Sequence, residues 1–224
     1  MNPLPLKASY LWTSKRCDEG LERIPPAMAT LLCLPGVWPE MSKLPKFDFV
    51  IGVDSGADAA TSHGIIPDLV VGDLDSVIKE NYPHQDLIII SEQDDNDLSK
   101  ALRFCLEKNL KEISIVGFTG KRNDHELANY AALHNANENL DIKVILEDMI
   151  VQRVVSSNDV CFVAPIGTLI SIFSFEETKV KTTGLKWNLD EKIRFSSRGL
   201  SNRTVESMIS ISTTGCVFVL IHNS

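Results

Sequence analysis

The chain has 224 residues, of which 44% are hydrophobic and 23% are charged, and its formal net charge is −8 at pH 7. This composition is typical of a globular protein rather than a disordered one. The negative charge disfavours nucleic acid as a partner, because binding to a phosphate backbone depends on clustered lysines and arginines. No apolar stretch approaches the roughly 20 residues of a membrane-spanning helix. We therefore expect a cytoplasmic protein that binds neither nucleic acid nor membrane.

The five cysteines form no paired motif. They include no Cys-x-x-Cys sequence, and no histidine stands at the spacing of a zinc ligand. We assign them no chemistry, because free cysteines usually behave as small buried side chains.

Residues 28–148 alternate short β-rich runs with helical stretches. Short, continuously apolar strands of this kind are typical of a parallel sheet buried on both faces, with helices as crossover connections. The clearest helix covers Asp97–Lys108, which carries its apolar residues on one face. We therefore predict an α/β domain, with residues 1–27 as an N-terminal extension without an assigned role. The predicted strands are Leu31–Leu34, Phe49–Val53, Leu69–Val71, Leu87–Ile90, Ile113–Val116 and Ile142–Leu146.

Residues 149–224 are β-rich and contain no convincing helix. Turn residues such as Asn158-Asp159 and Thr214-Gly215 separate the runs, which is typical of a small antiparallel sandwich or barrel. We therefore predict a second, all-β domain that begins near residue 149. Its predicted strands are Met149–Val155, Val160–Val163, Leu169–Phe175, Lys179–Thr183, Thr204–Ile211 and Cys216–Ile221.

Aspartates follow the predicted parallel strands at the points where these strands end. In chain order they are Asp54, Asp73, Asp75 and Asp97. Because the carboxyl ends of parallel strands line the crevice in which open α/β sheets bind ligands, we expect these side chains to converge. A single aspartate in such a loop also serves as a helix cap or turn former, and this alternative applies most to Asp97. The pair Asp73 and Asp75, next to a glycine, favours a functional role.

Converging carboxylates need a cation. Two unit charges about 4 Å apart repel each other by roughly 4 kcal/mol at an effective dielectric constant of about 20. Mg²⁺ offsets such repulsion, and it typically binds one or two carboxylates together with water and substrate phosphates. The spacing of Asp73 and Asp75 allows them to share one magnesium ion.

A glycine-containing loop, Gly117–His125, lies between a predicted strand and a helix. Its glycines permit a tight turn, Lys121 and Arg122 supply cationic donors, and a helix N-terminus favours anions. The loop is therefore a candidate phosphate site, although the chain lacks the P-loop kinase motif. Asp124 is either the helix cap or a functional residue, and His125 has no assigned role.

Several segments, taken together, resemble the thiamine pyrophosphokinase family. They follow the family's order and cover the chain from about residue 50 to its end. GDLDS alone is a weak signal, whereas its combination with NDLSKAL and TTGLKWNL is a strong one. The segments are VDSGADAA (53–60), GIIPDLVVGDLDS (64–76), EQDDNDLSKAL (92–102), GFTGKRNDH (117–125), TTGLKWNL (182–189) and GLSN (199–202).

The resemblance implies an α/β domain followed by a β-sandwich, in a homodimer with active sites at the interface. It also implies Mg²⁺-dependent transfer of diphosphate from ATP to the hydroxyl group of thiamine, which leaves AMP. The residues that match the family's magnesium and phosphate site are Asp73, Asp75, Asp97 and Arg122. The other matching residues are Asp54 and Gln93 in active-site loops, and Trp187, Ser201 and Asn202 in motifs associated with thiamine.

Other interpretations remain open at this point. Lys121 replaces a family glycine, and the loop after Asp54 departs from the family pattern, so the preferred nucleotide is open. Asp75 and Asp97 are both candidate general bases. Trp187 is alternatively a core residue of the sandwich, as tryptophan often is in that fold. A receiver-type regulatory module and a metal-dependent phosphatase would also explain the aspartates, but not TTGLKWNL.

Overall fold

The computed structural model describes residues 28–73, 77–90, 95–156 and 159–223. The N-terminal extension, Asp75 and Gln93 lie outside these residues. None of the helices in the described ranges is long and apolar enough to cross a membrane.

The N-terminal half contains a parallel sheet with the strand order β6-β5-β1-β2-β3-β4. The central strands are buried on both faces, as shown by Leu31, Leu32 and Cys33 of β1, which have no exposed surface. These short apolar runs therefore form the parallel sheet that their composition predicts. The strands are β1 (Ala29–Cys33), β2 (Phe49–Val53), β3 (Leu69–Gly72), β4 (Asp86–Ile89), β5 (Glu112–Val116) and β6 (Asp141–Ile145).

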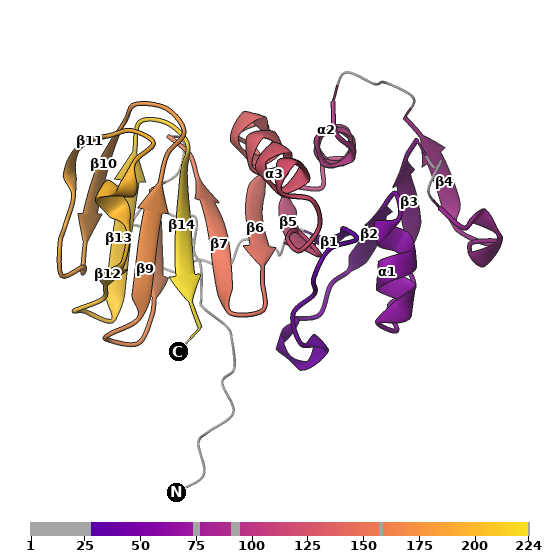
Figure 1. Cartoon of the computed structure of the whole chain (residues 1–224), viewed down its shortest axis with the longest axis horizontal. Helices are drawn as coiled ribbons and strands as arrows, with labels where there is room; N and C mark the ends of the chain where they lie inside the picture. The colour runs from indigo at the N-terminus through magenta and orange to yellow at the C-terminus, as the bar shows by residue number, and fades with distance from the viewer. Residues whose placement is uncertain (1–27, 74–76, 91–94, 157–158, 224) are drawn as a thin grey trace, which may run out of the picture.

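Helices cover both faces of this parallel sheet (Figure 1). Helix α1 (Gly56–Ser62) packs on one face, where Ala60 meets Leu31 and Cys33. Helices α2 (Asp97–Glu107) and α3 (Asn123–Asn135) pack on the other face. Short 3₁₀ turns occur at Met41–Lys43 (η1), Lys79–Asn81 (η2) and Ser197–Gly199 (η3).

The same sheet continues into the C-terminal half. Strand β7 (Met149–Val154) pairs antiparallel with β6, so a single 10-stranded sheet runs through both halves of the chain. A 4-stranded sheet, in the order β11-β10-β13-β8, packs against the antiparallel part and closes a sandwich around Ile170, Ile209 and Val219. The strands are β8 (Val160–Val163), β9 (Leu169–Phe173), β10 (Thr178–Thr183), β11 (Asp190–Ile193), β12 (Asn202–Arg203), β13 (Met208–Thr213) and β14 (Val217–His222).

The prediction of an α/β region followed by an antiparallel β region is confirmed, with three differences in detail. The short strand β12 was not predicted. Strand β11 was not predicted, because its sequence is polar and only Ile193 is buried. Strand β13 begins at Met208 rather than at Thr204, because Val205 donates its backbone N–H to Gly184 in a turn. The division into domains at residues 148 and 149 stays a prediction, since the large sheet crosses it without a break.

Candidate active site

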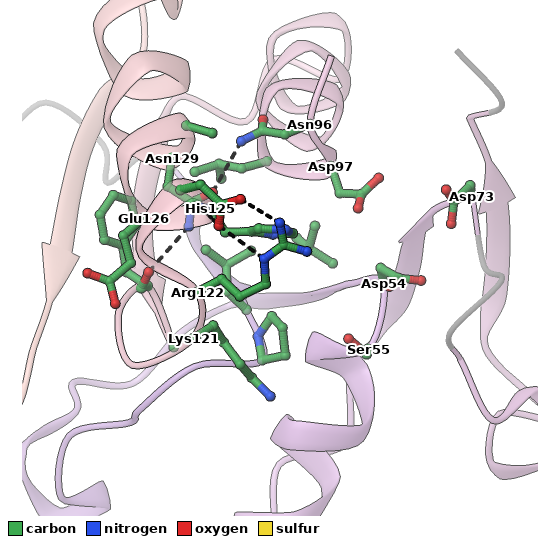
Figure 2. Close-up of a pocket in the computed structure, with 18 residues that line it drawn as sticks. Asp54, Ser55, Asp73, Asn96, Asp97, Lys121, Arg122, His125, Glu126 and Asn129 are labelled. Carbon is green, nitrogen blue, oxygen red and sulfur yellow. Dashed lines mark hydrogen bonds and ion pairs between the residues drawn. The ribbon is translucent and has the colours of Figure 1, made fainter. Parts of the chain in front are cut away.

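A cavity of about 650 Å³ lies at the carboxyl edge of the parallel strands. It opens where the strand order reverses, between β1 and β5, which is the usual ligand site of open α/β sheets. Figure 2 shows Asp54 and Asp73 on one side of this cavity and Arg122 on the other. The polar lining residues are Asp54, Ser55, Asp73, Asn96, Asp97, Lys121, Arg122, Asp124, His125, Glu126 and Asn129.

Close backbone contacts hold the loops that follow β1 and β5 together. Gly36 donates its N–H to the carbonyl oxygen of Gly117 at 2.8 Å, and Val37 donates to that of Thr119 at 2.7 Å. Gly117 has φ of 70°, and a Cβ atom there would lie 1.9 Å from the carbonyl oxygen of Leu34. Only glycine fits this conformation and this approach, so the glycine loop forms a fixed wall of the cavity.

Asp54 and Asp73 come from neighbouring strands. Asp54 has a left-handed backbone, with φ of 48°, and donates its N–H to Val71 at 2.8 Å. A Cβ atom on Gly72 would lie 3.1 Å from the Cβ of Asp54, so the glycine permits the close approach of these two strand ends. Both aspartates therefore face one cavity, although they are far apart in the sequence.

Asp97 faces the same cavity from the first turn of α2. The alternative that Asp97 is the helix cap is wrong, because Asn96 occupies that position and accepts a hydrogen bond from the Ser99 N–H at 2.9 Å. Asp97 instead accepts a hydrogen bond from the ammonium group of Lys100 at 3.0 Å. The Lys100 side chain is only 4% exposed. The cavity edge thus has a buried counter-ion that our sequence analysis did not identify.

Arg122 and Asp124 form an ion pair at the entrance to α3. Nε and Nη2 of Arg122 donate to the two carboxylate oxygens of Asp124 at 3.1 and 2.5 Å. This hydrogen bonding lowers the pKa of the Asp124 carboxyl group. Arg122, rather than Asp124, occupies the cap position, and no side chain caps α3 there. Glu126 accepts a hydrogen bond from the N–H of Gly120 at 2.6 Å and so fixes the glycine loop.

The C-terminal residues that match motifs of the family form a separate cluster. Asn202 is buried and joins Trp187 twice, accepting from its N–H at 3.2 Å and donating to its carbonyl oxygen at 2.7 Å. Ser201 has φ of 59° and donates its N–H to Ser171. The Trp187 side chain is 54% exposed, so the alternative that it belongs to the sandwich core is wrong. No described residue of this cluster lines the cavity of the α/β half.

The proposed magnesium ligands are only partly described. Asp73 and Asp97 line the cavity, whereas Asp75 and Gln93 lie outside the described residues. Among the residues that are described, no three carboxylate, histidine or cysteine side chains lie close enough to form a metal site by themselves. Mg²⁺ needs only one or two carboxylates when water and phosphate complete its ligands, so the donor set fits this ion.

Sequence reasoning missed further residues that support the site. Asn96 donates to Asn129 at 3.2 Å, and Asn129 donates to the carbonyl oxygen of Phe118, which ties α2, α3 and the glycine loop together. Lys100 had a detectable signal, because a lysine three positions after an aspartate on a helix is its neighbour. The Asn96 to Asn129 contact had none, since it joins two separate helices.

Comparison with known proteins agrees with this arrangement. The sequence pattern of the thiamin pyrophosphokinase catalytic domain matches residues 42–146, and that of the thiamin pyrophosphokinase vitamin B1 binding domain matches residues 155–217. The chain belongs to the thiamin pyrophosphokinase family. Most residues that line the cavity therefore lie in the match to the family's catalytic domain, and the Trp187 cluster lies in the match to its vitamin B1 binding domain.

Individual relatives support this family assignment. Thiamine pyrophosphokinase of Bacillus subtilis (strain 168) is 35% identical over 102 residues, which cover 42% of this chain and 48% of the relative. Thiamine pyrophosphokinase 3 of Oryza sativa subsp. japonica is 32% identical over 148 residues, which cover 55% of this chain and 52% of the relative. The chain thus spans about half the length of these curated relatives. The crystal structure of thiamine pyrophosphokinase from Bacillus subtilis superposes with a TM-score of 0.74 at 25% identity, and covers 88% of this chain and 99% of that one.

Proposed function

We propose that the chain transfers diphosphate from ATP to the hydroxyl group of thiamine, giving thiamine diphosphate and AMP. The observation that carries this proposal is the cavity at the strand-order reversal, which combines Asp54, Asp73 and Asp97 with the cationic glycine loop. An acidic cluster opposite cationic donors suits a polyphosphate that arrives with a divalent cation. Membership of the family supplies the identity of the two substrates.

The reaction needs one bond to form and one to break. The thiamine hydroxyl oxygen attacks the β-phosphorus of ATP, the bond from that phosphorus to the oxygen that bridges it to the α-phosphorus breaks, and AMP leaves. The hydroxyl proton passes to a carboxylate, for which Asp75 and Asp97 are the candidates. Arg122 and Lys121 bind phosphate oxygens, and this positioning and charge neutralisation is most of what phosphoryl transfer requires of a protein.

We propose that Asp73, Asp75 and Asp97 hold Mg²⁺ in this cavity, with Asp54 and Gln93 beside the bound phosphates. When bound, the ion would neutralise charge on the phosphate oxygens. Arg122 is free to exchange partners at small cost, because its pair with Asp124 is exposed and exposed ion pairs contribute little. The expectation of a cytoplasmic enzyme remains part of this proposal.

Product analysis tests the proposed activity. Purified protein should convert ATP to AMP only when thiamine is present, with one thiamine diphosphate formed per AMP. Release of free phosphate without thiamine would indicate a phosphatase, and stable self-phosphorylation would indicate a receiver module. Comparison of nucleoside triphosphates in this assay defines the preferred donor.

We further propose a homodimer in which each active site combines the cavity of one chain with the Trp187 cluster of the other. The supporting observation is that Trp187 is half-exposed, yet no residue of this cluster lines the cavity of its own chain. An aromatic face there would attract the cationic thiazolium ring by about 0.5–2 kcal/mol. A two-fold axis would then create two equivalent composite sites.

Hybrid dimers test the composite site. Asp73→Asn and Trp187→Ala homodimers should each be impaired, the first in turnover and the second in thiamine binding. After joint unfolding and refolding, half of the dimers are hybrids with one normal site each, so roughly a quarter of all sites should recover. Activity no higher than the average of the separate variants, in a sample shown to contain hybrids, would place both residues in one chain's site.

A further inference from the structure

A buried ammonium group lies beside Asp97 at the edge of the cavity. Lys100 faces inward from the first turns of α2 and is 4% exposed, and its Nζ atom lies 3.0 Å from Oδ1 of Asp97. Lysine is rarely buried to this extent without a charged partner. Within the described part of the chain, Asp97 is the carboxylate at ion-pair distance from this ammonium group.

The two members of this pair differ in their surroundings. The Asp97 side chain is 37% exposed and lines the cavity, whereas Lys100 is not among the lining residues. In Figure 2 the Asp97 carboxylate points toward the side of the cavity where Asp54 and Asp73 lie. The hydrogen bond from Lys100 therefore holds one end of the carboxylate while the group as a whole remains accessible to a ligand.

We propose that Lys100 is a positioning residue for the transfer reaction and acts through Asp97. This inference rests on the proposed function, and it adds to it a residue that contacts neither substrate. The positive charge keeps Asp97 in one orientation beside two like-charged neighbours that would otherwise repel it. The ammonium group also competes with a divalent cation for the Asp97 carboxylate, so the aspartates of the cavity do not all coordinate the cation at once.

This double role predicts opposite effects on cation binding and on turnover. Removal of the ammonium group makes the acidic side of the cavity more negative, so a divalent cation should bind more tightly. Turnover should nevertheless fall, because Asp97 loses its fixed orientation. Loss of a residue that supports a metal ligand typically lowers activity or metal affinity by about 10–100-fold. Here the lost group is itself a cation that repels the metal ion, so only the turnover should fall. If Lys100 only stabilised α2, its removal would instead lower the cation affinity, the turnover and the melting temperature together.

The test uses the full chain with Lys100→Met, Asp97→Asn and the double variant. Lys111→Met, which removes an exposed lysine outside the cavity, is the matched control. Mn²⁺ binding without substrates is measured by electron paramagnetic resonance, turnover by thiamine-dependent AMP formation, and folding by circular dichroism. We expect Lys100→Met to bind Mn²⁺ at least about threefold more tightly, because a competing positive charge is removed. We expect it to lose at least about tenfold in kcat. In a protein that already carries Asp97→Asn, Lys100→Met should change the Mn²⁺ affinity and kcat by less than about twofold each, because the carboxylate through which Lys100 acts is absent.

Lys100→Arg keeps the charge and should retain the wild-type affinity for Mn²⁺ and most of the turnover. Unchanged kcat in Lys100→Met would overturn the inference, as would weaker Mn²⁺ binding. An equal loss of kcat with and without Asp97 would also overturn it, since Lys100 would then act independently. These outcomes are distinct from failure of the proposed function, which would appear as absence of thiamine-dependent AMP formation in the wild-type protein. The measurement of Mn²⁺ binding needs no turnover, so it tests the inference even if the protein does not form AMP.

Discussion

Asn96 connects the stability of the fold to the geometry of the cavity, so Asn96→Ala is the most informative substitution outside the aspartates. Its side chain caps α2 by accepting from Ser99, and it also donates to Asn129 on α3. Loss of a helix cap costs about 1 kcal/mol. Loss of a partly buried hydrogen bond costs about a further 1 kcal/mol. We therefore expect Asn96→Ala to lower the free energy of unfolding by about 2 kcal/mol.

This loss is measurable by urea denaturation followed by circular dichroism. In a chain of this size, about 2 kcal/mol corresponds to a decrease of roughly 4–8 °C in melting temperature. Asn96→Ser is the matched control, because serine retains the cap and loses only the contact with Asn129. It should cost about half as much. Turnover of Asn96→Ala should fall too, since Asp97 lies in the turn that frays. An Asn96→Ala variant as stable as Asn96→Ser would refute the assignment of the cap.

Other substitutions and conditions test separate parts of the account. Asp73→Asn and Asp75→Asn should abolish turnover without loss of stability, because each removes a charge from a repelling group; near-normal turnover with normal circular dichroism would contradict the metal assignment. Gly117→Ala should cost more than about 2 kcal/mol in urea denaturation, because its φ is +70° and its Cβ would meet Leu34; a milder effect would mean that the wall relaxes. Burial raises the pKa of Cys33 and of Cys105 from 9.0 to about 12. The folded state thus holds these protons more tightly, so the free energy of unfolding should fall as pH rises from about 9 to about 12. Cys105→Ala should make this decrease with pH less steep. An equally steep decrease in the variant would mean that other groups cause it.

The sequence predicts the strands of the parallel sheet well because burial on both faces makes each of them a short apolar run. Strand β11 escaped prediction for the opposite reason, since it lies at the edge of the small sheet and exposes most of its side chains. The pairing of β6 with β7, which makes one sheet of both halves, is specified by register across a turn and leaves no separate compositional signal.

The site shows the same contrast. Aspartates at strand ends can be identified from the sequence, because topology alone brings those ends to one edge. The sequence could not show that Asn96, rather than Asp97, caps α2, because either side chain can cap a helix and only the local backbone decides. The exposure of Trp187 could not be predicted either, because the hydrogen bonds between Asn202 and the Trp187 backbone join residues 15 positions apart in the sequence.

The position of the transferred phosphorus atoms tests the central claim most directly. Purified protein is incubated with thiamine, Mg²⁺ and ATP labelled in turn at the α-, β- or γ-phosphorus. Transfer of an intact diphosphate to thiamine predicts that the β and γ labels both appear in thiamine diphosphate, while the α label remains in AMP. Appearance of the γ label alone in a thiamine product, or in free phosphate with ADP, would contradict the account.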